Sequence, residues 1–211
     1  MCSIGFMEKP NKIIEKLLEI FPDAQCELHY QNVFQLLIAV VLSAQTTDKR
    51  VNMVTEELFL VYPTAEMLAD ALLEDVKRII ASLGLYHTKA KNIINLSKKL
   101  IEQYRGRVPD TIDELMSLPG VGRKTANVVL SVGFHQPAIA VDTHVARVAN
   151  RLGIIHSDDV YEIEMALRAY FDEKDWSLVH HLFIHYGRYI CTARNPDCKR
   201  CPFGCPHQIK K

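Results

Sequence analysis

The fold is best inferred from one stretch of the chain, Leu118-Pro119-Gly120-Val121-Gly122-Arg123-Lys124-Thr125-Ala126. It predicts a tight turn between two helices, because its glycines permit backbone conformations that other residues avoid. The second helix is expected to begin near Arg123, and the N–H groups of its first turn have no partners within the helix. These groups carry partial positive charge and suit a phosphate oxygen. The stretch therefore predicts a hairpin that holds a nucleic-acid backbone without reading its sequence.

Lys124 opens the second helix of this hairpin, and its amine allows two interpretations. It can be one more phosphate contact, which is the usual role of a lysine at such a position. It can also be a nucleophile, which has to lose its proton first. A helix start, the neighbouring Arg123 and partial desolvation would all disfavour the ammonium form. The setting therefore favours activation of the Lys124 amine.

A carboxylate follows eighteen residues after Lys124, in the run Val141-Asp142-Thr143-His144. Asp142 precedes an apolar pattern of helical spacing, so it can be the N-cap of that helix. It can also be the charge partner of the lysine. The two roles are compatible, because a carboxylate at a helix N-terminus is stabilised in its ionised form.

The rest of the chain also reads as helical, and the fold class predicted is all-α. Apolar residues from Ile13 to Phe21 recur on one helix face, which ends at Pro22-Asp23. Ile38, Val40 and Val41 favour a strand by residue type, but the turn signals of a sheet are lacking. Further helices are predicted near residues 31–43, 48–61, 64–72, 74–82, 87–104, 111–117, 123–133, 143–152, 159–171 and 175–190.

Composition sets few limits on function. The 211 residues carry 25 basic and 25 acidic side chains, so the net charge does not favour a nucleic-acid partner. Basic residues nevertheless concentrate in 89–107 and 188–211, which predicts a basic face that would attract a polyanion. No apolar run is long enough to cross a membrane, and the start lacks the layout of a secretory signal. A cytoplasmic, nucleoid-associated and monomeric protein is the expectation.

The hairpin run and the Val-Asp-Thr-His run together resemble the helix-hairpin-helix DNA glycosylase superfamily, most closely its endonuclease III family. The resemblance extends from about Ile13 to the last cysteine. It implies that Lys124 is the nucleophile and Asp142 its partner. The implied DNA contacts of the hairpin are Gly120, Val121, Gly122, Arg123 and Thr125.

The implied reaction begins when the enzyme flips a damaged pyrimidine out of double-stranded DNA. Lys124 attacks C1′ of the sugar, the base leaves, and a Schiff base links enzyme and deoxyribose. β-Elimination then cleaves the strand on the 3′ side. The resemblance thus implies a bifunctional DNA glycosylase and abasic-site lyase that excises oxidised pyrimidines in base excision repair. Two alternatives stay open, a non-catalytic DNA-binding module and a sibling glycosylase that removes adenine.

Two more runs resemble family segments, Leu42-Ser43-Ala44-Gln45-Thr46-Thr47-Asp48 and Gly84-Leu85-Tyr86-His87-Thr88-Lys89-Ala90. The resemblance implies that Gln45 and Leu85 enter the duplex when the base is flipped. A wedge between base steps offsets the cost of unstacking with new contacts. Taken as residues alone, Leu85 would be a core or turn residue and Gln45 a polar group at a helix start.

Four cysteines close the chain, with the spacing Cys-x6-Cys-x2-Cys-x3-Cys at Cys191, Cys198, Cys201 and Cys205. Clustered cysteines in a reducing compartment indicate a metal site before a disulfide. The resemblance implies a [4Fe-4S] cluster, although the last interval is two residues shorter than is usual in the family. Tetrahedral zinc on four thiolates and unligated thiols are the alternatives.

The resemblance also implies two helical lobes with DNA in the cleft between them. The central lobe would span residues 25–135 and carry the hairpin. The second lobe would combine 1–24 with 136–211 and carry Asp142 and the cluster loop.

Overall fold

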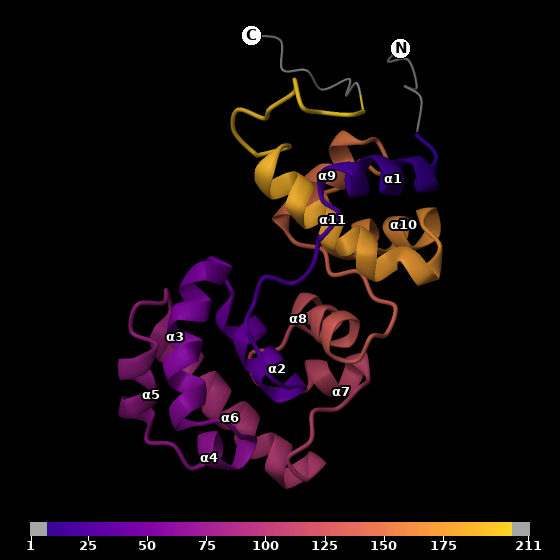
Figure 1. The fold of residues 1–211 in the computed structure, drawn as a ribbon. Coiled ribbons are helices and arrows are strands. Elements are labelled where there is room, and N and C mark those ends of the chain that lie inside the picture. Colours follow the sequence, from indigo (N-terminus) through magenta and orange to yellow (C-terminus); the bar gives the residue numbers. More distant parts are fainter. Residues whose placement is uncertain (1–7, 204–211) are drawn as a thin grey trace. The chain divides into compact units, whose positions relative to one another are not determined.

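The computed structural model describes residues 8–203, and every regular element within that range is helical. Figure 1 shows these helices in chain order. The all-α prediction is confirmed for this range, and each predicted helix is present within a few residues of its expected bounds. The α-helices are α1 (Pro10–Ile20), α2 (Val33–Leu42), α3 (Asp48–Val61), α4 (Ala65–Ala69), α5 (Leu73–Ile79), α6 (Tyr86–Tyr104), α7 (Ile112–Met116), α8 (Arg123–Val128), α9 (Thr143–Arg151), α10 (Val160–Tyr170) and α11 (Trp176–Tyr189).

The helix expected over 123–133 differs from a regular α-helix in its second half. Helix α8 ends at Val128 and continues as a π-helix, η1 (Val129–Gly133). The N–H of Phe134 closes this element by donating to the carbonyls of Val129 and Leu130, both at 3.3 Å. Such widened turns are frequent at functional sites, and this one directly follows the helix that carries Lys124.

The described residues divide into two compact units. Unit 1 contains residues 8–26 and 137–203, and unit 2 contains residues 27–136. Lys124, Gln45 and Leu85 are in unit 2, whereas Asp142 and the described tail cysteines are in unit 1. Each unit has its own apolar core and is described separately.

Unit 2 is built around α2, whose residues from Phe34 to Leu42 are all buried. A helix that is apolar on every side has to be enclosed by other helices, which explains the run at Ile38, Val40 and Val41. Helices α3, α6, α8 and η1 pack against α2, and α4 packs against α6. The C-terminal end of α2 leads directly into the segment that contains Gln45.

Unit 1 joins α1 to the last three helices around one core. Its largest fully buried side chains are Tyr186, Phe183, Ile13 and Leu17. Helices α9 and α11 approach each other closely at Gly187, where a Cβ atom would lie 2.9 Å from the Cβ of His144. A glycine is therefore required on α11 to bring its C-terminal end against the start of α9.

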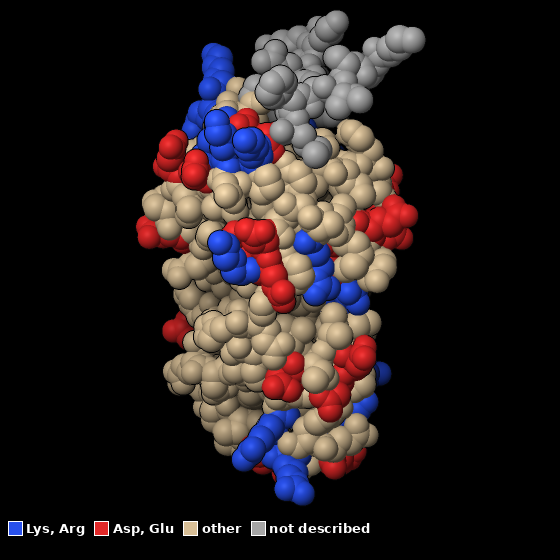
Figure 2. Space-filling model, turned by 90° about the vertical axis from the view of Figure 1, so that its right-hand side faces the viewer, with Lys and Arg blue, Asp and Glu red and all other residues tan. Residues whose placement is uncertain are grey.

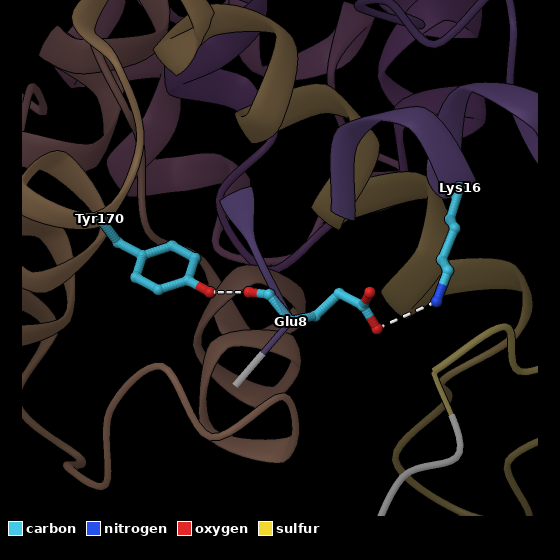
Figure 3. Close-up of polar contacts among 3 residues, drawn as sticks. All are labelled: Glu8, Lys16 and Tyr170. Carbon is cyan, nitrogen blue, oxygen red and sulfur yellow. Dashed lines mark hydrogen bonds and ion pairs between the residues drawn. The ribbon is translucent and has the colours of Figure 1, made fainter. Parts of the chain in front are cut away.

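Polar contacts fasten the start of the described chain to α10 in this unit (Figure 3). The hydroxyl of Tyr170 donates a hydrogen bond to the backbone carbonyl of Glu8. The Glu8 carboxylate accepts from Lys16 Nζ at 3.0 Å. One residue therefore holds two partners, through its main chain and through its side chain.

Two of the basic side chains expected to form a face over 89–107 are engaged within unit 2. Lys89 is buried, and Lys99 donates to the carbonyl of Ser117 at 2.6 Å. Lys98 lines a pocket with Glu66 and Asp70. On the face drawn in Figure 2, basic and acidic side chains are intermingled and separated by other residues. Among the residues described, no helix is both long and apolar enough to span a membrane.

We predict that Tyr170→Phe lowers the free energy of unfolding by about 0.5–1.5 kcal/mol, because the Glu8 carbonyl loses its donor. Burial raises the pKa of Tyr170, and the charge of Glu8 raises it further. The contribution is therefore complete below about pH 10 and is lost as the pH rises above that value. Chemical denaturation at pH 7 and above pH 10 measures both effects.

The matched control is Tyr62→Phe, because the Tyr62 hydroxyl has no hydrogen-bond partner within residues 8–203. Its effect is expected to stay within about 0.5 kcal/mol. Equal losses for the two substitutions would contradict the assigned role of Tyr170.

Candidate active site

The hairpin expected from the sequence is present between α7 and α8. Gly120 has a φ of +79°, and a Cβ atom there would lie 2.9 Å from Nδ2 of Asn92. Both the backbone conformation and the close approach require glycine at this position. The N–H of Val121 donates to the carbonyl of Leu118 at 3.1 Å and closes the turn, while the Val121 side chain is buried.

Helix α8 begins without a side-chain cap. Gly122 is its N-cap residue, and a Cβ atom there would meet nothing within 4 Å. The helical bonding begins when the N–H of Ala126 donates to the carbonyl of Gly122 at 2.9 Å. The amides of Lys124 and Thr125 come before that bond, so this helix start presents backbone donors beside open space.

Lys124 is the second residue of α8, and its side chain is exposed. The expectation of partial desolvation is therefore not met within unit 2, because no neighbouring element of the unit covers this side chain. What the local structure does supply is a helix start, with Arg123 as the preceding residue. The exposed amine and the uncapped amides therefore lie next to each other at one helix start.

Asp142 is the N-cap of α9. Its Oδ1 accepts from the N–H of His144 and from the N–H of Val145, both at 2.8 Å. The side chain is half-buried. These bonds hold the carboxylate in one orientation and leave its second oxygen, Oδ2, outside the cap. The capping role considered for Asp142 is therefore confirmed, and it is compatible with chemistry at Oδ2.

Gln45 and Leu85 share an unusual backbone conformation. Both are exposed, and both have a left-handed conformation, with φ of 55° and 58°. Leu85 is 63% exposed, which contradicts a role in the core. A left-handed conformation is unfavourable for residues other than glycine and costs about 1 kcal/mol or more. Gln45, which follows the C-terminal end of α2, and Leu85, which is the N-cap of α6, are therefore functional candidates.

The tail cysteines that the structure describes gather around one pocket. Cys191, Cys198 and Cys201 line it together with Tyr186 and Arg151. Cys191 is buried, Cys201 is half-buried and Cys198 is exposed. The fourth predicted ligand, Cys205, lies outside the described residues.

Hydrogen-bond donors point at two of these sulfur atoms. Arg151 Nη1 lies 3.3 Å from Cys191 Sγ, and the hydroxyl of Tyr186 donates to Cys201 Sγ at 3.0 Å. Donors of this kind stabilise negative charge on sulfur, so the pocket suits thiolates. Among residues 8–203, no three or more His, Cys, Asp or Glu side chains are arranged to hold a single metal ion.

Arg147 connects the Asp142 end of α9 to the cysteine end of α11, and sequence reasoning missed it. Its guanidinium donates to the carbonyls of Cys191 at 2.9 Å, Gly187 at 2.6 Å and Thr143 at 3.2 Å. Burial and the neighbouring Arg151 lower the pKa of Arg147, whereas Cys191 and Asp142 oppose this shift.

Arg151 lies one turn further along α9 and donates to the carbonyl of Thr192 at 2.8 Å. Two arginines at i and i+4 repel each other on an isolated helix. Their presence in the sequence was therefore a sign that both side chains bind hydrogen-bond acceptors outside the helix. The acceptors are the carbonyls that end α11 and begin the cysteine tail.

Comparison with known proteins places this geometry in a family. The HhH-GPD superfamily of base excision DNA repair proteins matches residues 38–173. The endonuclease III of Bacillus subtilis (strain 168) is 53% identical over 190 residues, which cover 90% of this chain and 87% of the relative. The chain belongs to the endonuclease III family of this superfamily. The endonuclease III of Thermotoga maritima is 46% identical and covers 80% of this chain and 79% of its own length.

Solved structures of endonuclease III with DNA are similar over almost the whole chain. A trapped covalent intermediate, an estranged-adenine complex, matches with a TM-score of 0.90 and 50% identity. It covers 94% of this chain and 96% of its own. A non-covalent complex matches with a TM-score of 0.88 and 51% identity, and covers 92% and 91%. A thermostable thymine-DNA glycosylase, at 22% identity and a TM-score of 0.81, shares the fold.

These relationships settle the class of activity. The chain is a DNA glycosylase and abasic-site lyase of base excision repair, and its substrate is damaged double-stranded DNA. The alternative of a non-catalytic DNA-binding module is superseded by this result.

Proposed function

We propose that Lys124 is the nucleophile of this activity. The observation that carries the proposal is the exposed Lys124 amine on the first turn of a helix without a side-chain cap. The lone pair of Nζ attacks C1′ of the damaged nucleotide, and the bond from C1′ to the base breaks. The base leaves with that electron pair and takes up a proton. The C1′–O4′ bond of the resulting aminal then breaks, O4′ takes up a proton, and the opened sugar is joined to Nζ as a Schiff base. Loss of a C2′ proton then expels the 3′ phosphate, and water releases the enzyme.

Asp142 is proposed as the carboxylate that balances the positive charge developing on the sugar. Two backbone amides hold its Oδ1, so the carboxylate is already oriented before the reaction and does not have to be ordered during it. Arg147 holds the start of α9 through the Thr143 carbonyl and thereby supports this orientation.

The proposed grip on DNA comes from the hairpin, through Gly120, Val121, Gly122, Arg123 and Thr125. The turn and the amides of α8 would bind phosphate oxygens, which positions the duplex without sequence preference. Gln45 and Leu85 are proposed to fill the space left by the flipped nucleotide. Their exposure and left-handed backbones support that role.

The proposed substrates are oxidised pyrimidines. Because these lesions occur in chromosomal DNA, we propose that the enzyme works at the nucleoid of the cytoplasm. We further propose two lobes around the DNA, the central one over residues 25–135 and the other over 1–24 with 136–211.

We propose that Cys191, Cys198, Cys201 and Cys205 hold a [4Fe-4S] cluster. The all-sulfur donor set and the donors from Arg151 and Tyr186 support an anionic iron–sulfur group. In a cubane each thiolate binds its own iron, so the sulfur atoms need not converge on one point as they do around zinc. Such a group would cross-link the tail to α11 and serve structure.

We predict that Lys124→Ala abolishes the covalent adduct that borohydride traps on DNA with an abasic site, because no other amine takes its place. Lys124→Arg should also lose the adduct and retain most of the affinity for DNA, because it keeps the positive charge. Gel electrophoresis of the adduct and equilibrium DNA binding measure the two effects. Lys12→Ala, at an exposed position on α1, serves as the control. An adduct in either Lys124 variant would refute the assignment.

Asp142 gives a second prediction, in which stability and activity separate. Asparagine caps helices about as well as aspartate, so Asp142→Asn should leave the free energy of unfolding within about 0.5 kcal/mol. Asp142→Ala should lower it by about 1 kcal/mol. Both variants should excise an oxidised pyrimidine at least about tenfold more slowly in single-turnover assays, because both lack the negative charge.

Asp159 provides the matched control, because it caps α10 through the N–H groups of Tyr161 and Glu162. Asp159→Ala should cost about 1 kcal/mol as well and leave the excision rate unchanged. Full activity of Asp142→Asn would show that Asp142 is only a cap.

The cluster proposal predicts visible charge-transfer absorption and about four irons per chain in freshly prepared protein. Cys191→Ser should reduce both, because a hydroxyl is a poor iron–sulfur ligand. Cys26→Ser is the control and should change neither. Zinc without iron in the metal analysis would contradict the proposal.

A further inference from the structure

Lys89 is a buried cation that the reaction described above does not use. Its side chain lies on α6 and is 4% exposed. Burial lowers the pKa of Lys89, and no carboxylate pairs with it among residues 8–203. Its one side-chain partner in that range is the hydroxyl of Thr46, at 2.9 Å from Nζ. A buried ammonium group without a counter-ion is costly, so this position needs a reason other than stability.

The partner of Lys89 lies directly beside Gln45. The hydroxyl of Thr46 accepts from Lys89 and donates to the carbonyl of Ala44 at 3.3 Å. This chain of bonds reaches the residues on both sides of Gln45. The N–H of Thr46 also donates to the Ser43 carbonyl at 3.0 Å. The left-handed turn at Gln45 is therefore held by hydrogen bonds among its own residues and by the bond from Lys89 on α6.

Lys89 is connected just as directly to Leu85. Its N–H donates to the carbonyl of Leu85 at 3.0 Å, which forms the first turn of α6. One residue thus bonds to the Leu85 turn through its main chain and to the Gln45 turn through its side chain. Gln45 and Leu85 are forty residues apart in sequence. Within unit 2, Lys89 is a direct link between the two strained turns.

We infer that Lys89 is a positioning residue that fixes the Gln45 turn against the Leu85 turn, so that both side chains enter the duplex at a set spacing. The inference rests on the proposed role of Gln45 and Leu85 as wedges. Because Lys89 is only 4% exposed, the role inferred for it is to hold the two turns and not to contact DNA. A strained backbone persists only where its surroundings hold it, and the Lys89–Thr46 bond supplies that hold.

The experiment compares two DNA substrates within each variant. In the first, an abasic site faces a normal base, which the wedges have to separate from the stack. In the second, the abasic site faces a stable abasic analogue, so no opposite base has to be displaced. Lys124 performs the same chemistry on both. The quantity measured is the single-turnover cleavage rate on the first substrate divided by the rate on the second. This ratio reports wedge function, and it does not depend on the fraction of protein that is folded.

Lys89→Met and Thr46→Val should each lower this ratio by about tenfold, the equivalent of one hydrogen bond to a charged group. Thr46→Ser keeps the hydroxyl and should have the same ratio as the unmodified protein. The double variant should be no worse than the more affected single variant, because both remove the same bond. Thr55→Val is the matched control, since the Thr55 hydroxyl is buried and donates to carbonyls of its own helix.

The outcomes separate the inference from the proposal beneath it. If Gln45→Ala and Leu85→Ala lower the ratio but Lys89→Met and Thr46→Val do not, the positioning role of Lys89 is wrong. If Gln45→Ala and Leu85→Ala leave the ratio unchanged, the proposed wedges are wrong, and the inference about Lys89 is overturned with them. A fall in the ratio for Thr55→Val equal to that for Thr46→Val would also overturn it.

Discussion

The N–H groups in the first turn of a helix have no partners within that helix, and the site in each unit depends on how they are satisfied. At α9 the carboxylate of Asp142 accepts two of them, and this fixes the orientation of the side chain. At α8 the N-cap is Gly122, which has no side chain to offer. One helix start thus holds a carboxylate in place, and the other presents its amides to a ligand.

Holding these helix starts requires a rigid framework, which the buried side chains supply. In unit 2 the enclosed helix α2 packs against η1 and α8, so the hairpin lies on a close-packed base. In unit 1 the guanidinium of Arg147 joins α9 to the C-terminal end of α11 through carbonyl oxygens. Asp142 and the cysteine pocket are consequently parts of one connected structure, although Cys191 is far from Asp142 in sequence.

Backbone strain marks the remaining candidates. Gln45 and Leu85 have left-handed backbones although neither is glycine. Both are exposed, so no contact with the core offsets the free-energy cost of this conformation. Lys89 adds a second unfavourable feature at the same place, a buried charge with a single hydroxyl partner. Arg105 and His135 of unit 2 are left-handed as well, so what distinguishes the turns at Gln45 and Leu85 is that one buried lysine bonds to both.

The sequence alone determined the all-α class, the bounds of most helices, the hairpin and the capping position of Asp142, because each depends on local spacing and on residue type. Tertiary structure decided what depends on residues far apart in the chain. It buried Lys89, exposed Lys124 and Leu85, and brought Arg147 and Arg151 to the cysteine tail. It also changed the end of the α8 helix into a π-helix. Burial and long-range hydrogen bonds arise only when distant segments pack together, so a local pattern cannot contain them.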